Sequence, residues 1–92
     1  MNFEWDEDKG TANFKKHKIA FDEAKTVFRD PFSITINDSD HSENESRYID
    51  IGQSSKGRIL TVCYTERREK IRIINCRKAT FSERKIYGKK EF

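Results

Sequence analysis

Residues 59–77 have the sequence ILTVCYTERREKIRIINCR, in which two strand-like runs flank a short charged segment. The first run spans Ile59 to Glu66 and the second spans Lys70 to Arg77, and such runs are typical of β-strands. The charged segment between them, which begins at Arg67, predicts a tight turn. The sequence therefore predicts an antiparallel hairpin here, and the rest of the chain can be placed around it.

The segments before and after this hairpin predict two further strands and three helices. Alternating apolar and polar residues predict strands near 34–37 and 48–51, and the sequence allows a short extra strand at 3–5. Helices are expected from Asp6 to Lys18, from about Phe21 to Phe28, and in a short segment after Arg77. The predicted fold class is α+β: two N-terminal helices, a four-stranded antiparallel meander and a C-terminal helix, with the helices packed on one face.

Length and composition limit the class of protein. The 92 residues form one domain, 1–92, with a modest core, because 38% of them are charged and only 34% hydrophobic. No run has the ~20 apolar residues of a membrane span, and the N-terminus lacks the pattern of a secretory signal. Cys63 and Cys76 have neither CxxC spacing nor a histidine-rich neighbour, so both are expected to be reduced thiols. We therefore expect a soluble cytoplasmic protein with no metal and no cofactor.

Basic residues are concentrated after residue 66, although the net charge of the chain is only +3. The series is Arg67, Arg68, Lys70, Arg72, Arg77, Lys78, Arg84, Lys85, Lys89 and Lys90. Such a distribution favours an anionic partner such as RNA, DNA or an acidic protein segment, and the charge alone does not choose among these.

The segment that ends the chain combines cations, a carboxylate and a phenol. Side chains three and four positions apart share one helical face, and here they are Thr80, Glu83, Arg84 and Tyr87. Arg77 and Lys78 precede them at the end of the strand, and together these groups are able to bind a phosphodiester and move its protons. The alternative is structural, because Thr80-x-x-Glu83 is also a capping box.

One stripe of the first predicted helix is polar where many helices are apolar. Its members recur at spacings of four, seven and eight: Lys9, Asn13, Lys16 and His17. The stripe is either a solvated face or a cationic ridge that contacts a phosphate backbone, with His17 able to accept and donate a proton. Trp5, the only tryptophan, is expected to pack at the core, with base stacking as the alternative.

Further candidates lie on the strands of the hairpin. Alternation places Arg77 on the same face as the core isoleucines Ile71 and Ile73, at the polar margin of the core. An arginine fixed by a strand is better preorganised than one on a loop, which makes Arg77 the leading candidate for phosphate contact. Arg58, near a strand start, is equally able to pair with a carboxylate or to hold phosphate.

Ordered motifs cover nearly the whole chain. The first are Trp5-Asp6-x-x-Lys9-x-x-x-Asn13-x-x-Lys16-His17, Phe21-x-x-Ala24-x-x-Val27-Phe28-x-Asp30-Pro31 and Ile51-Gly52-x-Ser54-x-x-Gly57-Arg58. Tyr64-Thr65-x-Arg67, Arg72-Ile73-Ile74 and Arg77-Lys78-Ala79-Thr80-x-x-Glu83-Arg84-x-x-Tyr87 follow. This order resembles the BrnT family of toxins. One departure is Lys18, where the family commonly has glycine, and this change affects the helix C-cap.

The resemblance implies a ribonuclease toxin of a type II toxin–antitoxin pair with a RelE-like fold. It further implies that the toxin stops translation by cutting RNA. The implied partner is a BrnA-type antitoxin, a small ribbon-helix-helix protein that binds DNA and holds the toxin inactive in a heteromeric complex. Operator DNA is then reached only through the antitoxin.

The chemistry of RNA cleavage sorts the candidate residues. A metal-free cut needs the ribose 2′-OH deprotonated, the phosphate stabilised and the 5′ leaving oxygen protonated, and we expect a metal-independent endoribonuclease. The catalytic candidates are Arg77, Lys78, Arg67, His17, Glu66 and Tyr87, with Lys9 and Glu83 as further acid–base candidates. The candidates for RNA contact are Lys9, Lys16, Arg58 and Arg84. Structural roles are expected for Thr80, Glu83, Trp5 and Asn13. The alternatives are a non-catalytic basic module for nucleic acid or an acidic partner, and a degenerate, inactive toxin.

Overall fold

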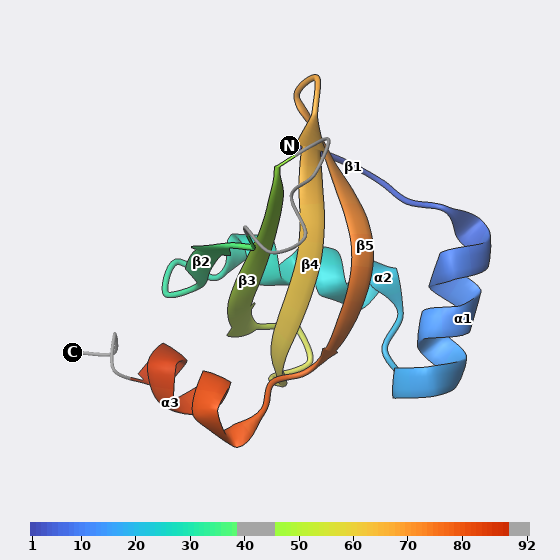
Figure 1. The fold of residues 1–92 in the computed structure, drawn as a ribbon. Coiled ribbons are helices and arrows are strands. Elements are labelled where there is room, and N and C mark those ends of the chain that lie inside the picture. The colour runs from blue at the N-terminus through green and yellow to red at the C-terminus, as the bar shows by residue number, and fades with distance from the viewer. Residues whose placement is uncertain (39–45, 89–92) are drawn as a thin grey trace.

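The structure is a computed structural model that describes residues 1–38 and 46–88. Its elements in chain order are β1 (Asn2–Glu4), α1 (Glu7–His17), α2 (Phe21–Ala24), the 3-10 helix η1 (Lys25–Arg29), β2 (Ile34–Asn37), β3 (Arg47–Gln53), β4 (Ile59–Arg67), β5 (Lys70–Lys78) and α3 (Phe81–Gly88). Two members of the basic C-terminal series, Lys89 and Lys90, lie outside the described residues. Figure 1 shows a central sheet with α1 at one side and α3 at one end.

The five strands form one sheet in the order β1-β5-β4-β3-β2. The predicted meander is confirmed, because β2 to β5 each pair with their sequence neighbours in antiparallel fashion. The short strand that the sequence allowed is also present, and β1 pairs in parallel with β5, with Phe3 opposite Ile71. The sheet is therefore mixed and has five strands. Parallel neighbours need a long crossover connection, which the whole chain between β1 and β5 provides.

The predicted hairpin closes through a two-residue turn, Arg68 and Glu69, whose φ angles are 48° and 71°. Two consecutive left-handed residues are typical of a type I′ turn, whose twist matches that of the strands it joins. Arg67 and Lys70 form the last pair of the ladder beside this turn. Since neither turn residue is glycine or asparagine, the turn carries strain of about 1–2 kcal/mol per residue.

The main core lies between one face of the sheet and the segment that contains α2 and η1, which crosses behind the strands in Figure 1. Ile19, Phe21, Ala24 and Val27 pack there against Leu60, Val62, Tyr64, Ile71, Ile73 and Cys76. Phe28 extends this core, with its ring centroid 5.2 Å from that of Phe3 and 4.9 Å from that of Tyr64. The second helix is α-helical only as far as Ala24 and continues as η1 to Arg29. Asp30 then turns to an extended conformation, as the residue before a proline prefers.

A β-bulge reverses the faces of the last part of β5. The ladder shifts register between Cys63 and Tyr64, which leaves Ile74 of β5 without a partner. Beyond the bulge Cys76 is the residue that enters the core, where it is fully buried. The prediction that Arg77 shares the face of the core isoleucines is therefore wrong, because one extra residue shifts the alternation to the other face.

The third helix begins over the opposite face of the sheet from α2. Thr61 and Arg77 lie opposite each other in the ladder, on the face away from the core, and both donate hydrogen bonds to Glu83 of α3. The prediction that the helices pack on one face is wrong. The donors to Glu83 lie on the face away from the core, so α3 contacts the face opposite to the one that α2 covers. Near the end of α3, Tyr87 is buried and donates a hydrogen bond to Asp30. Within residues 1–38 and 46–88, no helix is long and apolar enough to cross a membrane.

Candidate functional site

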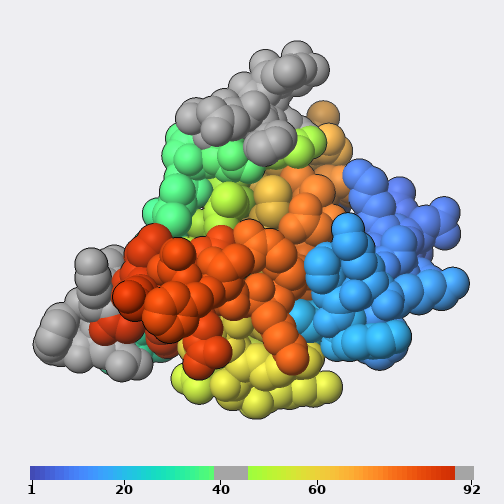
Figure 2. Space-filling model, turned by 60° about the horizontal axis from the view of Figure 1, so that its bottom comes forward, coloured from blue at the N-terminus to red at the C-terminus, as the bar shows by residue number. Residues whose placement is uncertain are grey.

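A shallow groove separates α1 from β5 and collects basic side chains from both. The lining residues are Lys9, Ala12, Asn13, Lys16, His17, Ile74, Asn75 and Arg77. Five predicted site residues therefore come together, with Lys9, Asn13, Lys16 and His17 on α1 and Arg77 on β5. Figure 2 shows β5, in orange, at the surface between α1 in blue and α3 in red. The described lining residues include no carboxylate, so the lining itself presents only positive or neutral side chains to an anion. We call this site the basic groove.

The side chain of Asn13 holds α1 against β5 at the floor of the basic groove. Its Oδ1 accepts a hydrogen bond from the backbone N–H of Cys76 at 3.1 Å. Its Nδ2 donates to the carbonyl of Ile19 at 3.0 Å and to Sγ of Cys76 at 3.3 Å. β1 pairs only with residues 70–72, so farther along this edge of β5 a side-chain amide replaces the missing strand. Because Asn13 is fixed in this way, Lys9, Lys16 and His17, which lie three and four positions from it, are held along the groove.

Caps at both ends fix the extent of α1. The carboxylate of Asp6 accepts hydrogen bonds from the backbone N–H groups of Asp8 and Lys9 at 2.8 and 3.1 Å, which confirms the predicted N-cap. At the other end, Lys18 has a φ of 60°, and its N–H donates to the carbonyl of Phe14 at 2.8 Å. This left-handed position favours glycine, so Lys18 costs the helix about 1 kcal/mol.

Arg77 is held at the groove by a carboxylate. Its Nη1 and Nη2 donate to the two oxygens of Glu83 at 2.7 and 2.9 Å. The side chain of Arg77 remains 38% exposed, against 20% for Glu83. The pair is therefore a bidentate clamp that fixes the guanidinium plane and leaves part of it open to a ligand.

Glu83 is in turn fixed by its own neighbours. Its Oε1 accepts hydrogen bonds from the hydroxyl of Thr61 at 2.9 Å and from the backbone N–H of Thr80 at 2.8 Å. The hydroxyl of Thr80 accepts the N–H of Glu83 at 3.2 Å, so the predicted capping box is confirmed. The hydrogen bonds from Arg77, above all, lower the pKa of Glu83 to about 2. The carboxylate therefore stays ionised across the physiological range.

Two predicted catalytic residues lie far from the basic groove. Glu66 and Arg67 are at the hairpin end of β4, where Arg67 lies opposite Lys70 in the ladder. Arg77 lies opposite Thr61, which is six residues from Arg67 along β4. Six residues of extended strand span roughly 20 Å. The structure therefore does not bring Glu66 and Arg67 together with Arg77. At the hairpin end, Arg67 instead lines a pocket with Glu4, Arg68 and Lys70.

The remaining predicted residues are divided between the surface and the interior. Lys78 and Arg84 are exposed, and each directly follows one member of the Arg77–Glu83 pair in the sequence. Tyr87 is buried, and its hydroxyl donates to Asp30 at 2.6 Å. Trp5 packs edge-on against Phe21, with ring centroids 5.8 Å apart.

Arg58, which directly precedes β4, forms a second arginine–glutamate pair of this kind. Its Nε donates to Oε2 of Glu23 at 3.0 Å, and its Nη2 contacts Oε1 of the same carboxylate. The hydroxyl of Ser54 also donates to this carboxylate, at 2.6 Å. The hydrogen bonds from Arg58 are the main reason that the pKa of Glu23 is lowered. The carboxylate of Glu23 is almost fully buried, with 4% of its side chain exposed.

Two groups of the site were missed by reasoning from the sequence. Asn75 lines the basic groove, and the hydroxyl of Thr61 holds Glu83. No spacing in the sequence signals either residue, because both positions depend on the bulge and on the pairing of β4 with β5. Among the described residues, no group of three or more His, Cys, Asp or Glu side chains is arranged to hold a metal ion.

The chain matches one protein-family model over residues 5–83, and the description of that model is "Ribonuclease toxin, BrnT, of type II toxin-antitoxin system". Among solved structures, it is similar to the ribonuclease toxin BrnT of Brucella abortus, whose crystal structure has a resolution of 1.1 Å. The match has 22% sequence identity and a TM-score of 0.66, and it covers 87% of this chain and 97% of that chain. At this identity the structural likeness shows the fold. No curated protein matches the chain.

Proposed function

Because this chain belongs to the BrnT family of ribonuclease toxins of type II toxin–antitoxin systems, we propose that it cleaves RNA in the basic groove and that a cognate antitoxin holds it inactive. One observation carries this proposal: Lys9, Lys16, His17 and Arg77 converge on one groove from two elements that are far apart in the sequence. A phosphodiester backbone is the anion that fits such an open, linear array of cations.

Arg77 is the proposed phosphate contact. In the reaction, the ribose 2′-oxygen attacks phosphorus, the bond from phosphorus to the 5′-oxygen breaks, and a 2′,3′-cyclic phosphate forms. Negative charge grows on the non-bridging oxygens during this step, and a guanidinium already fixed by Glu83 stabilises it without further reorganisation. Lys16 and Lys9 then hold the neighbouring phosphates as point charges.

His17 is the proposed proton-transfer group. It lines the same groove as Arg77 and is the one lining residue whose side chain both accepts and donates a proton near neutral pH. Glu66 lies at the far end of β4, Tyr87 is bonded to Asp30 in the interior, and Glu83 is held ionised by Arg77. The proton taken from the 2′-OH and the proton given to the 5′-oxygen pass through His17 or through water that it orients.

The proposed cut uses only side chains and no metal ion. Arg77 and the lysines supply the positive charge that a divalent cation supplies in metal-dependent nucleases. Cleavage is therefore expected to continue in EDTA. We further propose that the protein acts in the cytoplasm, where its RNA substrate and a BrnA-type antitoxin are present.

The test is inducible expression of the toxin without its antitoxin, followed by analysis of RNA integrity and of growth. We expect growth arrest and RNA fragments ending in cyclic phosphate, formed equally with and without EDTA. Intact RNA and normal growth from a soluble protein would contradict the enzyme assignment. Fragments that disappear only in EDTA would contradict the metal-free step alone. RNA that binds in a salt-dependent manner and is not cut would favour the non-catalytic basic module.

A further inference from the structure

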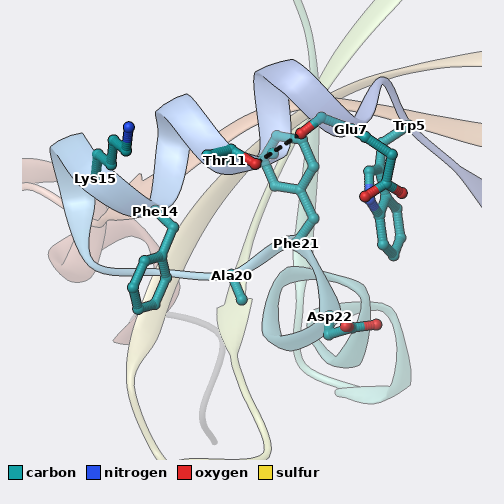
Figure 3. Close-up of a pocket in the computed structure, with 9 residues that line it drawn as sticks. Trp5, Glu7, Thr11, Phe14, Lys15, Ala20, Phe21 and Asp22 are labelled. Atoms are coloured by element: carbon teal, nitrogen blue, oxygen red, sulfur yellow. Dashed lines mark hydrogen bonds between the residues drawn. The ribbon is translucent and has the colours of Figure 1, made fainter.

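A second groove lies on the other flank of α1, between α1 and the start of α2 (Figure 3). Three aromatic side chains line it: Trp5 and Phe21 meet edge-on, and Phe14, with 50% of its surface exposed, lies toward the opposite end from Trp5 in Figure 3. Gly10 also lines the groove, and a Cβ at this position would lie 3.5 Å from both Trp5 and Phe21. Glycine therefore places no side chain against Trp5 at this point, whereas Phe21 is buried, with 2% of its surface exposed. We call this site the aromatic groove.

The rim of the aromatic groove is charged in an ordered way. In Figure 3, the carboxylates of Glu7 and Asp22 lie toward the Trp5 end, and Lys15 lies toward the Phe14 end. The acidic end repels a phosphate backbone chiefly through Glu7, because Asp22 is paired with Lys25, whose Nζ lies 3.3 Å from its Oδ1. The complementary ligand carries apolar side chains for the floor, a cation for the Glu7 end and an acidic group for the Lys15 end.

The two grooves occupy opposite sides of one helix. Glu7, Thr11 and Phe14 recur at spacings of four and three and face the aromatic groove, whereas Lys9 and Lys16 face the basic groove. At 3.6 residues per turn these two sets are about half a turn apart around the axis of α1. A ligand in one groove therefore does not displace a ligand from the other by direct contact.

We propose that the aromatic groove is the docking site for the cognate antitoxin, and that it takes a segment with an apolar anchor beside a basic residue. This inference rests on the antitoxin partnership in the proposed function. An exposed aromatic surface with a polar rim is typical of a protein-binding site. The acidic end of the rim selects a protein segment with a cation over nucleic acid. Neutralisation then requires the rest of the antitoxin to extend around α1 to the basic groove.

The main test compares two single variants, each of which replaces one exposed phenylalanine with lysine. Phe14→Lys places a charge on the floor of the aromatic groove, and Phe32→Lys is the matched control, because Phe14 and Phe32 are 50% and 51% exposed. Both variants and the wild type are titrated with the purified cognate antitoxin, and RNA cleavage is measured in parallel. We expect Phe14→Lys to weaken antitoxin binding by at least about 30-fold. RNA cleavage by both variants should remain within about twofold of the wild type.

Expressed in cells with the antitoxin, Phe14→Lys should therefore arrest growth, whereas the wild type and Phe32→Lys should be neutralised. Antitoxin binding by Phe14→Lys at wild-type affinity would overturn the inference while leaving the ribonuclease assignment intact. Conversely, a wild type that binds the antitoxin through this groove but cuts no RNA would refute the ribonuclease and keep the inference. A wild type that binds no antitoxin would refute both the partnership and the docking site.

A second measurement remains decisive if Phe14→Lys does not fold. Trp5 is the only tryptophan of the chain, so its fluorescence reports on the aromatic groove. We expect the antitoxin to shift the Trp5 emission and the double change Glu7→Gln, Asp22→Asn to weaken binding by about tenfold, since both carboxylates lie on the rim. An unchanged emission in the fully formed complex would overturn the inference. A shift caused by a non-cleavable oligonucleotide would overturn it in favour of base stacking. If the wild type forms concentration-dependent dimers, and Phe14→Lys or the double change abolishes them, the inference would be overturned in favour of a second copy of this chain as the ligand of the aromatic groove.

Discussion

Two of the glutamate–arginine pairs among residues 1–38 and 46–88 are built from the same parts and placed in different surroundings. In each pair a hydroxyl and a guanidinium donate to one carboxylate: Ser54 and Arg58 to Glu23, and Thr61 and Arg77 to Glu83. The Glu23 side chain is 4% exposed and that of Glu83 is 20% exposed. The donor groups of the two pairs therefore do not tell a structural pair from a functional one. The surroundings of each pair do.

The surroundings of the two pairs differ in what lies beside the arginine. Arg58 also reaches toward the carbonyl of Lys18, and the pair joins α2 to the turn before β4. Arg77 lies at the edge of the basic groove with 38% of its side chain exposed. The Glu23–Arg58 pair therefore links two segments of the fold, whereas the Glu83–Arg77 pair presents a fixed cation to solvent. Substitutions at the two pairs should therefore affect different quantities.

The largest effect is expected from Arg77→Ala. Loss of a preorganised donor to the transition state lowers the rate of RNA cleavage by about 10²–10³-fold, because no other group in the groove presents a fixed guanidinium. Arg77→Lys keeps the charge but not the bidentate geometry and should lose about tenfold. Single-turnover cleavage of a defined RNA measures both, with the exposed Arg29→Ala as control. Wild-type toxicity from a soluble Arg77→Ala protein would remove Arg77 from the site.

The next effect is on stability and is expected from Arg58→Ala. This change leaves the carboxylate of Glu23 buried without its counter-ion, which costs about 3 kcal/mol of unfolding free energy. Urea unfolding followed by circular dichroism measures the loss, and Arg77→Ala should lose no more than about 1 kcal/mol in the same experiment, because its pair is more exposed. The folded fraction of Arg58→Ala should cut RNA at the wild-type rate. A specific loss of cleavage with unchanged stability would instead place Arg58 among the RNA contacts.

How far the sequence predicts this site can be judged on the two walls of the basic groove. The α1 wall is local: the spacing of Lys9, Asn13, Lys16 and His17 places them on one stripe, and all four line the groove. The β5 wall depends on the bulge at Ile74, which no local pattern signals because it arises from the pairing of two strands. The sequence therefore predicts Arg77 as a site residue but assigns it to the wrong face of the sheet.

Contacts between distant segments show the same limit. The spacing of Thr80 and Glu83 predicts the capping box, which the structure contains. The same spacing cannot show that Glu83 also holds Arg77 and Thr61, or that Tyr87 reaches Asp30, because these contacts depend on where α3 packs. A residue with one local explanation thus proved to have a second, tertiary one.

An intermediate effect is expected from Glu83→Gln, which separates the two roles of this residue. Glutamine still accepts the hydrogen bonds of Thr80 and Thr61 through its amide oxygen, but it no longer clamps both nitrogens of Arg77. Cleavage should fall by about tenfold, because the guanidinium loses its fixed orientation. The matched control is Thr80→Ala, which removes one cap bond at a cost of about 1 kcal/mol and leaves the clamp in place. Equal loss of cleavage in both variants would mean that Glu83 acts only through the stability of α3.

The smallest effect is a difference in acid stability. The pKa of Glu83 is lowered to about 2 from the ordinary glutamate value of 4.5, so the folded state holds the ionised form more strongly than the unfolded state does. Its contribution is therefore fully present above pH 4.5 and is lost as the pH falls toward 2. In urea unfolding, the wild type should exceed Glu83→Gln by about 1 kcal/mol at pH 6, after allowance for partial exposure. This difference should shrink steadily as the pH falls from 4.5 toward 2, because the carboxylate of the unfolded chain takes up a proton in this range before that of the folded chain does. A constant difference over this range would show that the Arg77–Glu83 attraction contributes nothing to stability and that the pair serves only to orient the arginine.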